Sequence, residues 1–269
     1  TNVNFDDASI KDLTARIHTA AAKTANACNG SIVSDYNMNN IWNANEAIRS
    51  LKSLILFGVR GMAAYAYHAM TLGYTDASLN QFFLTALDSL SKDWGMNELL
   101  PIVMEVGRFN LTCMELLDRA NTATYGTPAP VTVPLTVEKG PFIVITGHDL
   151  HDLKLLLEQT EGKGINIYTH GEMLPCHAYP ELKKYSHLKG NFGTAWQNQQ
   201  KEFAAFPGAV VMTSNCIINP NVGKYTDRIF TRSIVGWPGV THIEGDDFST
   251  VIEKAQSLEG FPYDEIPHY

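Results

Sequence analysis

The sequence predicts two architectures in one chain, a helical bundle over residues 1–127 and a Rossmann-like parallel α/β domain over residues 140–269. In the first part, apolar residues recur at helical spacing, which is typical of helices that pack side by side. In the second part, short β-branched runs alternate with helical segments, the order that produces a parallel sheet. Between them, residues 128–139 contain Pro128, Pro130 and Pro134, which favour an extended connector.

The expected bundle is built from long helices with short connections. The stretch 45–72 is the clearest of them, because Leu51, Ile55 and Met62 fall on one helical face. Residues 28–44 are rich in Asn and Ser and predict a loop or an irregular join. The expected helices span residues 9–27, 45–72, 77–90 and 97–121.

The α/β part opens with a strand–helix–strand unit. Residues 142–145 form a short apolar strand, and Leu153 and Leu157 belong to a helix that ends near Gly162 before a strand at 165–168. A unit of this kind joins parallel strands through a right-handed crossover. Further strands are predicted over 209–213 and 229–235, and further helices over 180–188, 195–206 and 247–258.

Three chemically different side chains follow three of the predicted strands. His148 comes just after the first strand, Glu172 just after the second, and Cys216 just after the strand at 209–213. Ligands of open parallel sheets bind beyond the carboxyl ends of the strands. If these strands are neighbours, an imidazole, a carboxylate and a thiol meet at one edge, which is the composition of a metal site.

Each of these residues also has a purely structural interpretation. His148 alone is typical of a hydrogen-bonded turn, Glu172 of a loop or first-turn carboxylate, and Cys216 of a small buried side chain. His170 lies two residues before Glu172, and its side chain points the same way in an extended chain. We therefore expect His170 to orient the Glu172 carboxylate through a hydrogen bond.

Cys176 and His177 look like a second pair of ligands, but we expect them to open a helix instead. We interpret the other cysteines and histidines as structural. They are Cys28, Cys113, His18, His68, His151, His187, His242 and His268.

Composition excludes several classes of function. The net charge is −8 and no basic stripe is present, so we expect no nucleic-acid partner. No apolar run approaches the roughly 18 residues of a membrane span, and no signal peptide is visible. The four cysteines show no CxxC pairing, which favours a reducing, cytoplasmic location.

Several motifs resemble one family closely. They are GHDL at 147–150, HGEMLP at 170–175, GNFGTAW at 190–196, TSNC at 213–216, DRIFTRSIVGWPGV at 227–240 and GFPYDEIPH at 260–268. Together they resemble the hybrid-cluster protein family, also called prismane or hydroxylamine reductase. The resemblance covers nearly all of residues 140–269. It is looser in the helical part, where TNVNF at 1–5 and YGTPAP at 125–130 carry it.

The resemblance implies a set of ligands. The family's hybrid cluster is an iron–sulfur–oxygen assembly held by a His, two Glu and four Cys, and the motifs match His148, Glu172 and Cys216 to three of them. The family's other ligands belong to a further α/β domain after residue 269, and its cubane-binding cysteines precede residue 1. We therefore expect this chain to be a fragment that lacks both segments and holds a partial bundle.

The resemblance also implies an activity. The complete protein is expected to reduce hydroxylamine to ammonia and nitric oxide to nitrous oxide, with electrons from an NADH-dependent reductase entering through the cubane. The isolated chain is expected to be inactive, with no metal or one adventitious metal. Two alternatives stay open, a zinc-dependent hydrolase that uses the same His, Glu and Cys with water, and a metal-free module whose helical bundle binds a partner.

Overall fold

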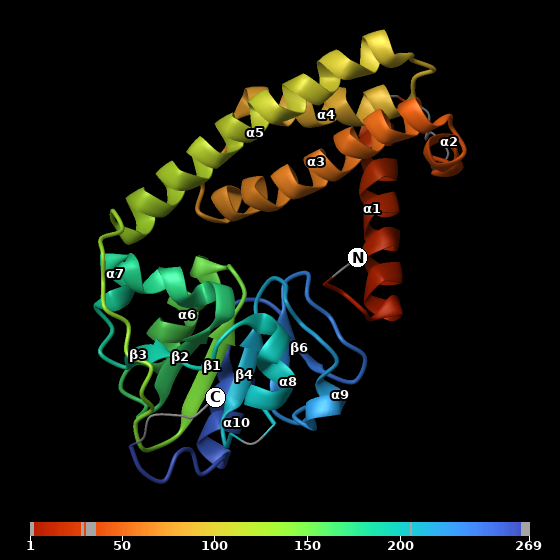
Figure 1. Ribbon diagram of the computed structural model, residues 1–269. Coiled ribbons are helices and arrows are strands. Elements are labelled where there is room, and N and C mark those ends of the chain that lie inside the picture. Colours follow the sequence, from red (N-terminus) through yellow and green to blue (C-terminus); the bar gives the residue numbers. More distant parts are fainter. Residues whose placement is uncertain (1–2, 28–29, 31–35, 205, 265–269) are drawn as a thin grey trace. The chain divides into compact units, whose positions relative to one another are not determined.

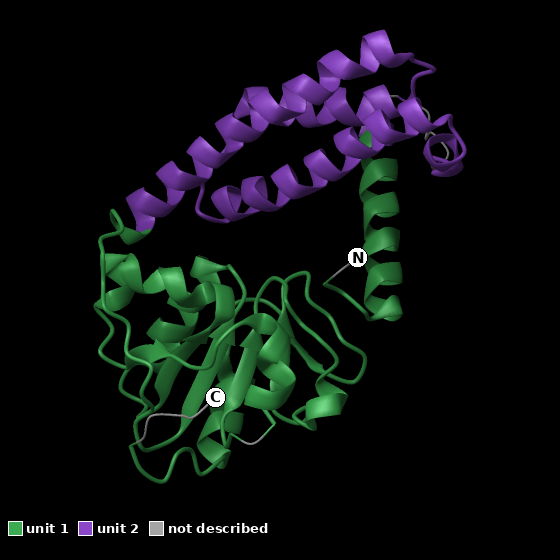
Figure 2. Ribbon diagram, viewed as in Figure 1, with its two compact units in different colours: residues 1–24, 125–269 green, residues 25–124 purple. Residues whose placement is uncertain are grey.

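The computed structural model describes residues 3–27, 30, 36–204 and 206–264. The chain divides into two compact units, one formed by residues 1–24 with 125–269 and the other by residues 25–124 (Figure 2). The helix α1 (Asp7–Ala27) begins in the first unit and ends in the second. The division into a bundle over 1–127, a connector over 128–139 and a domain over 140–269 stays a prediction.

The helical unit is formed mainly by three long helices (Figure 1). Asn45 and Asp76 cap α3 and α4 by accepting hydrogen bonds from backbone N–H groups of the first turn. All three helices were predicted, and α5 continues four residues further than expected. Of the predicted join 28–44, residues 28–29 and 31–35 lie outside the described residues. The helices are α2 (Asn39–Trp42), α3 (Glu46–Thr71), α4 (Ala77–Ser91) and α5 (Met96–Tyr125).

One hydrophobic core holds this unit together. Ile55 of α3, Phe82 of α4 and Leu99 of α5 are among its buried residues. Phe82 also stacks on Phe109, with ring centroids 4.2 Å apart. The buried Lys52 ammonium donates to the carbonyl oxygens of Leu90 and Lys92, where it satisfies acceptors at the carboxyl end of α4.

The other unit is built on a six-stranded sheet in which every pairing is parallel (Figure 1). The order β3-β2-β1-β4-β5-β6 is that of a doubly wound Rossmann sheet, which confirms the predicted fold class. In this order the chain direction across the sheet reverses between β1 and β4. The strands are β1 (Phe142–Thr146), β2 (Asn166–His170), β3 (Leu188–Asn191), β4 (Ala209–Met212), β5 (Ile229–Arg232) and β6 (Thr241–Ile243).

Two strands were not predicted. The predicted helix 180–188 is only the short α7 (Pro180–Lys183), and β3 follows it. The sequence of β3, LKGN, lacks the β-branched residues that indicate a strand, and β6 has only three residues. Hydrogen-bonded pairing with β2 and β5 therefore determines that these two segments are strands.

The helices around the sheet are mostly short. The predicted helix 195–206 is limited to η2 (Trp196–Asn198) and α8 (Gln199–Glu202). Asp247 accepts from the Ser249 N–H at 2.9 Å and so satisfies one backbone donor at the start of α10. The remaining helices are α6 (Leu150–Thr160), η1 (Gly171–Ala178), α9 (Pro220–Gly223) and α10 (Ser249–Ser257).

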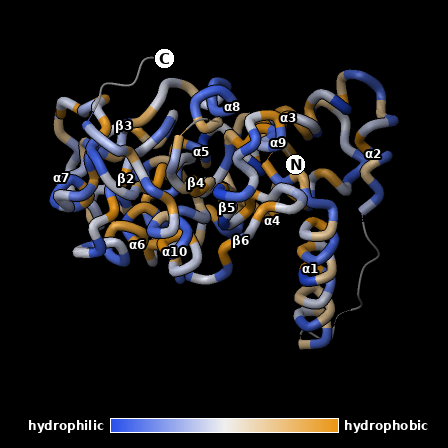
Figure 3. Tube along the Cα trace, turned by 90° about the horizontal axis from the view of Figure 1, so that it is seen from below, coloured by the Kyte–Doolittle hydropathy of each residue, from blue (hydrophilic) through white to orange (hydrophobic). Residues whose placement is uncertain are grey.

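Apolar residues cover both faces of the sheet. On one face, Val144 and Val210 join a cluster of aromatic side chains that includes Phe203 and Tyr225. The residues between them in the strands point to the other face, where α10 packs on β1 and β4. In Figure 3 the apolar colours gather around α6, α10 and β4. Because both faces are buried, polar groups of these strands are displayed mainly at the strand ends.

Candidate functional site

Three loops from neighbouring strands meet at the carboxyl edge of the sheet. β2, β1 and β4 lie side by side in that order. His148 follows β1 after Gly147, and Glu172 follows β2 after Gly171. Both glycines have positive φ, 109° and 56°, so each chain turns sharply as it leaves its strand. Cys216 follows β4 and has a φ of 69° itself. The loops therefore turn at the edge where β1 and β4 reverse the strand order.

The close approach of two of these loops requires a glycine. A Cβ atom at Gly147 would lie 2.9 Å from the Ser214 amide nitrogen and would overlap with Thr213 Oγ1. Without a side chain at position 147, the loop after β1 packs directly on the loop after β4. His148 is thereby brought to the loop that carries Cys216.

The three predicted site residues come together around one carboxylate oxygen. His148 Nε2 lies 2.7 Å from Glu172 Oε2, and Cys216 Sγ lies 3.5 Å from the same oxygen. The His148 and Glu172 side chains are 42% and 48% exposed, so the group opens to solvent. An imidazole, a carboxylate and a thiol thus share one small volume. Their role as ligands or catalytic groups stays a prediction.

Two residues that sequence reasoning did not single out hold this group in place. Ser214 Oγ accepts from the His148 N–H at 2.9 Å and lies 3.2 Å from His148 Nδ1. Asn215 Oδ1 accepts from the Cys216 thiol at 3.2 Å and from Ser214 Oγ at 3.3 Å. Contact at Nδ1 orients the ring so that Nε2 faces Glu172. Their position next to Cys216 in the sequence was the available signal.

The surroundings of Cys216 favour the neutral thiol. Burial raises the pKa of this thiol to about 12, and the nearby Glu172 carboxylate adds to the shift in the same direction. Without a cation the group is a thiol at neutral pH. A metal ion that binds the sulfur must displace its proton.

His170 does not support Glu172 in the expected way. Its ring is fully buried, with Nε2 2.9 Å from Glu202 Oε2 and Nδ1 3.4 Å from Thr146 Oγ1. The expectation assumed that the chain stays extended beyond His170. Instead β2 ends there, and Gly171 starts η1, so the alternation of side chains stops before Glu172.

Cys176 and His177 lie near the end of η1, rather than at the start of a helix as expected. The reason is that the helical turn already begins at Gly171. Burial raises the pKa of the Cys176 thiol and lowers the pKa of His177 to about 4. His177 Nε2 lies 2.9 Å from Thr169 Oγ1. Both residues pack inside the fold.

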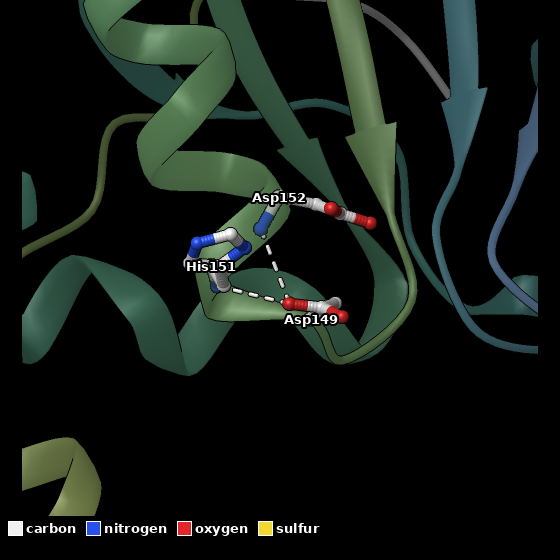
Figure 4. Close-up of side chains that lie close together, drawn as sticks. All are labelled: Asp149, His151 and Asp152. Atoms are coloured by element: carbon white, nitrogen blue, oxygen red, sulfur yellow. Dashed lines mark hydrogen bonds between the residues drawn. The ribbon is translucent and has the colours of Figure 1, made fainter. Parts of the chain in front are cut away.

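A second cluster of possible ligands lies at the start of α6, where ligand atoms of Asp149, His151 and Asp152 come within 4.8 Å of one another (Figure 4). Asp149 Oδ1 already accepts the N–H groups of His151 and Asp152 at 2.9 and 3.1 Å. Asp152 Oδ1 accepts from Arg232 Nε, and Arg232 Nη2 lies 2.8 Å from Asp246 Oδ1. The helix N-terminus and a guanidinium therefore balance these carboxylates, which disfavours a cation there.

The carboxyl group of Asp152 has a strongly shifted pKa. Burial, and secondly the charge of Asp149, raise the pKa of Asp152 to about 7, while Arg232 acts in the opposite direction. Asp152 Oδ2 is buried without a hydrogen-bond partner among the described residues. The cluster joins α6 to β5 and to Asp246.

A model of the family described as Prismane/CO dehydrogenase matches residues 1–267. The chain belongs to the Prismane/CO dehydrogenase family. This confirms the resemblance that the motifs indicated, and it agrees with membership of the hybrid-cluster proteins. The Prismane/CO dehydrogenase family is one of iron–sulfur redox enzymes, so oxidoreductase chemistry and iron–sulfur binding are the functions that membership supports.

The donor set at the carboxyl edge fits part of such a centre. Thiolate sulfur is a ligand for soft iron sites, whereas imidazole and carboxylate suit iron that also binds oxygen. Cys216 supplies the thiol, His148 the imidazole and Glu172 the carboxylate, and the first two lie within hydrogen-bond distance of Glu172 Oε2.

Within the part of the chain that the structure describes, no helix combines the length and apolar character needed to cross a bilayer.

Proposed function

We propose that this chain contributes the His148, Glu172 and Cys216 side of a hybrid-cluster site in an oxidoreductase that reduces hydroxylamine to ammonia, nitric oxide to nitrous oxide, or both. The observation that carries the proposal is the meeting of these three side chains on one carboxylate oxygen at the edge where the strand order reverses. Membership of the Prismane/CO dehydrogenase family supports iron–sulfur redox chemistry at such a site.

Each residue has a distinct part in the proposal. Cys216 gives up its proton and binds through sulfur, and His148 binds through Nε2 while Ser214 lies at Nδ1. Glu172 is the exposed carboxylate, able to accept a proton from the thiol or to bind beside it. When bound, the cluster supplies electrons and an iron with an open position for a small nitrogen compound.

The proposal extends to partners and to the remaining ligands. Electrons come from an NADH-dependent reductase through a cubane, and the family's other Cys and Glu ligands complete the cluster site. The isolated chain is then inactive and holds no metal or one adventitious metal. The proposed setting is the cytoplasm, without a nucleic-acid or membrane partner.

A zinc-dependent hydrolase is the second candidate. The exposure of His148 and Glu172 favours it, because a zinc ion held by three protein ligands keeps a position open for water. Metal analysis separates the two candidates. Stoichiometric zinc with no iron, in protein prepared without oxygen, is the result that the hydrolase requires.

The deciding test is the Glu172→Ala substitution in the full-length protein prepared without oxygen. We expect loss of iron and acid-labile sulfide and loss of hydroxylamine and nitric oxide reduction, because the shared carboxylate is gone. Glu253→Ala, an exposed glutamate on α10, is the matched control and should change neither. Unchanged cluster content and turnover in Glu172→Ala would rule the proposal out.

A further inference from the structure

The short segment of η2 and α8 carries two buried polar side chains that the ligand set does not use. Gln199 is 1% exposed and Glu202 is 8% exposed. Burying an amide and a carboxylate costs free energy unless both are hydrogen-bonded. The question is therefore which parts of the fold these two groups hold.

Gln199 holds the backbone at Cys216 and just after it. Its Nε2 donates to the Cys216 carbonyl oxygen at 2.5 Å and to the Trp196 carbonyl oxygen at 2.7 Å. Its Oε1 accepts from the Ile218 N–H at 3.3 Å. One side-chain amide thus ties η2 to the loop that presents the thiol.

This contact matters because the Cys216 backbone is strained. Its φ of 69° lies in the left-handed region, which a cysteine rarely adopts. Such a conformation is energetically unfavourable and persists only where the surroundings enforce it. The hydrogen bonds between Gln199 and the backbone of Cys216 and Ile218 hold the chain in this conformation.

Glu202 holds the loop on the other side of the site. Its Oε2 lies 2.9 Å from His170 Nε2, and its Oε1 accepts from the Thr194 N–H at 3.0 Å and from Thr194 Oγ1 at 2.5 Å. His170 is the last residue of β2, and Glu172 follows after Gly171. Glu202 therefore fixes the point from which the Glu172 loop departs.

We infer that Gln199 and Glu202 are positioning residues that together set the separation of the Cys216 thiol and the Glu172 carboxylate. Three residues apart on one helical turn, they hold the two loops that supply these donors. Gln199 contacts the Cys216 backbone and not its sulfur, so it acts through the loop. The inference rests on the proposed function for its chemical purpose, but its geometric part is testable without a cluster.

The test compares Gln199→Met with Gln200→Met in the 269-residue chain. The substitution is the same at neighbouring positions, and the half-buried Gln200 also donates to a loop carbonyl, that of Asn219 at 2.8 Å. One measurement is the rate at which iodoacetamide alkylates Cys216, read by peptide mass spectrometry. The other is Co²⁺ binding, read from the thiolate-to-cobalt charge-transfer band. Thermal unfolding checks that each variant folds.

We expect Gln199→Met to raise the Cys216 alkylation rate several-fold and to weaken Co²⁺ binding by about tenfold with a shifted charge-transfer band, the scale found for residues that orient metal ligands. Gln200→Met should match the parent chain. If Gln199→Met does not fold, Gln199→Glu serves, because it keeps the acceptor for Ile218 and loses the donor to Cys216.

The outcomes distinguish failure of the positioning role from failure of the proposed metal site. Faster alkylation in Gln199→Met with no Co²⁺ binding even by the parent chain would support the positioning role and count against a metal site in this chain. Co²⁺ binding by the parent chain with equal affinity, band and alkylation rate in both Met variants would overturn the positioning role and leave the metal site standing.

Discussion

At the scale of single residues, the site depends on backbone conformation as much as on its donors. Gly147 and Gly171 turn the chain after β1 and β2, and Cys216 itself takes the left-handed conformation after β4. The first two positions suit glycine, which adopts positive φ without a steric cost. At Cys216 the donor and the strained position coincide, so neighbouring side chains must hold it.

Gly147→Ala should damage both the fold and the site. The new Cβ would lie 2.9 Å from the Ser214 amide nitrogen at a φ of 109°, so strain and overlap together should cost at least about 2 kcal/mol of unfolding free energy. Urea denaturation measures this cost, and Co²⁺ titration measures the displacement of His148.

Gly162→Ala is the matched control for that substitution. Its φ is also positive, 73°, but no atom lies within 4 Å of the new Cβ. We expect a loss of about 1 kcal/mol from backbone strain alone and unchanged Co²⁺ binding. Equal losses for the two variants would show that the close approach of the loops after β1 and β4 is unimportant.

The meeting of His148, Glu172 and Cys216 could be predicted from the sequence, whereas the residues that hold them in place could not. His148, Glu172 and Cys216 each follow an apolar strand, and parallel strands end at one edge. Gln199 and Glu202 lie in a segment that was predicted as one continuous helix. Their partners are distant or are set by loop geometry, which periodicity does not encode. His170 was misjudged for the same reason, because the turn at Gly171 ends the strand pattern.

At the scale of elements, a buried ion pair joins α6 to β5. Arg232 pairs with Asp152, and its second contact goes to Asp246. A buried charge that loses its partner is strongly destabilising. Surface ion pairs such as Lys254 with Asp227 contribute much less.

Arg232→Met should therefore cost about 3 kcal/mol of unfolding free energy, whereas Lys254→Met should cost less than about 1 kcal/mol. The pKa of Asp152 is already raised, and it rises further without Arg232. A folded state with a raised carboxyl pKa binds more protons than the unfolded chain, so stability falls as pH rises.

Urea denaturation of Arg232→Met at about pH 6 and about pH 8 checks the sign, since the loss should be larger at the higher pH. A loss that is the same at both pH values would mean that Asp152 does not titrate in this range. The loss of unfolding free energy in Lys254→Met should be nearly the same at both pH values.

The elements that the sequence predicted well are those with a strong internal pattern. β1, β2, β4 and β5, like α3, α4 and α5, carry apolar periodicity or β-branched runs. β3 and β6 are strands only because β2 and β5 offer backbone groups to pair with. Tertiary pairing of this kind overrides local preference and is invisible in a single segment.

At the scale of the whole molecule, each of the two units has its own hydrophobic core. One core lies among α3, α4 and α5, and the other lies on the sheet. A unit with a separate core can unfold as a separate cooperative step. Each unit also contains a buried free cysteine, Cys113 in the helical unit and Cys176 in the α/β unit.

Leu99→Ala should lower the urea concentration at which Cys113 becomes alkylated and leave that of Cys176 unchanged. Leu156→Ala on α6 should do the reverse. Both leucines are fully buried, so each substitution should cost about 2–5 kcal/mol within its own unit. Pulse labelling with peptide mass spectrometry reads both cysteines in one sample. If both thiols shift together in either variant, the chain unfolds as one cooperative unit.

The two ends of the parallel strands lie at opposite edges of the sheet, and the edge at the amino ends is suited to protein engineering. All three donors leave from the carboxyl ends of strands, whereas the turn at residues 161–164, which leads into β2, lies at the amino ends. That turn is exposed, and its Gly162 and Gly164 face open space. A tag, a spectroscopic label or new chain termini introduced there would be held a full strand length away from His148, Glu172 and Cys216.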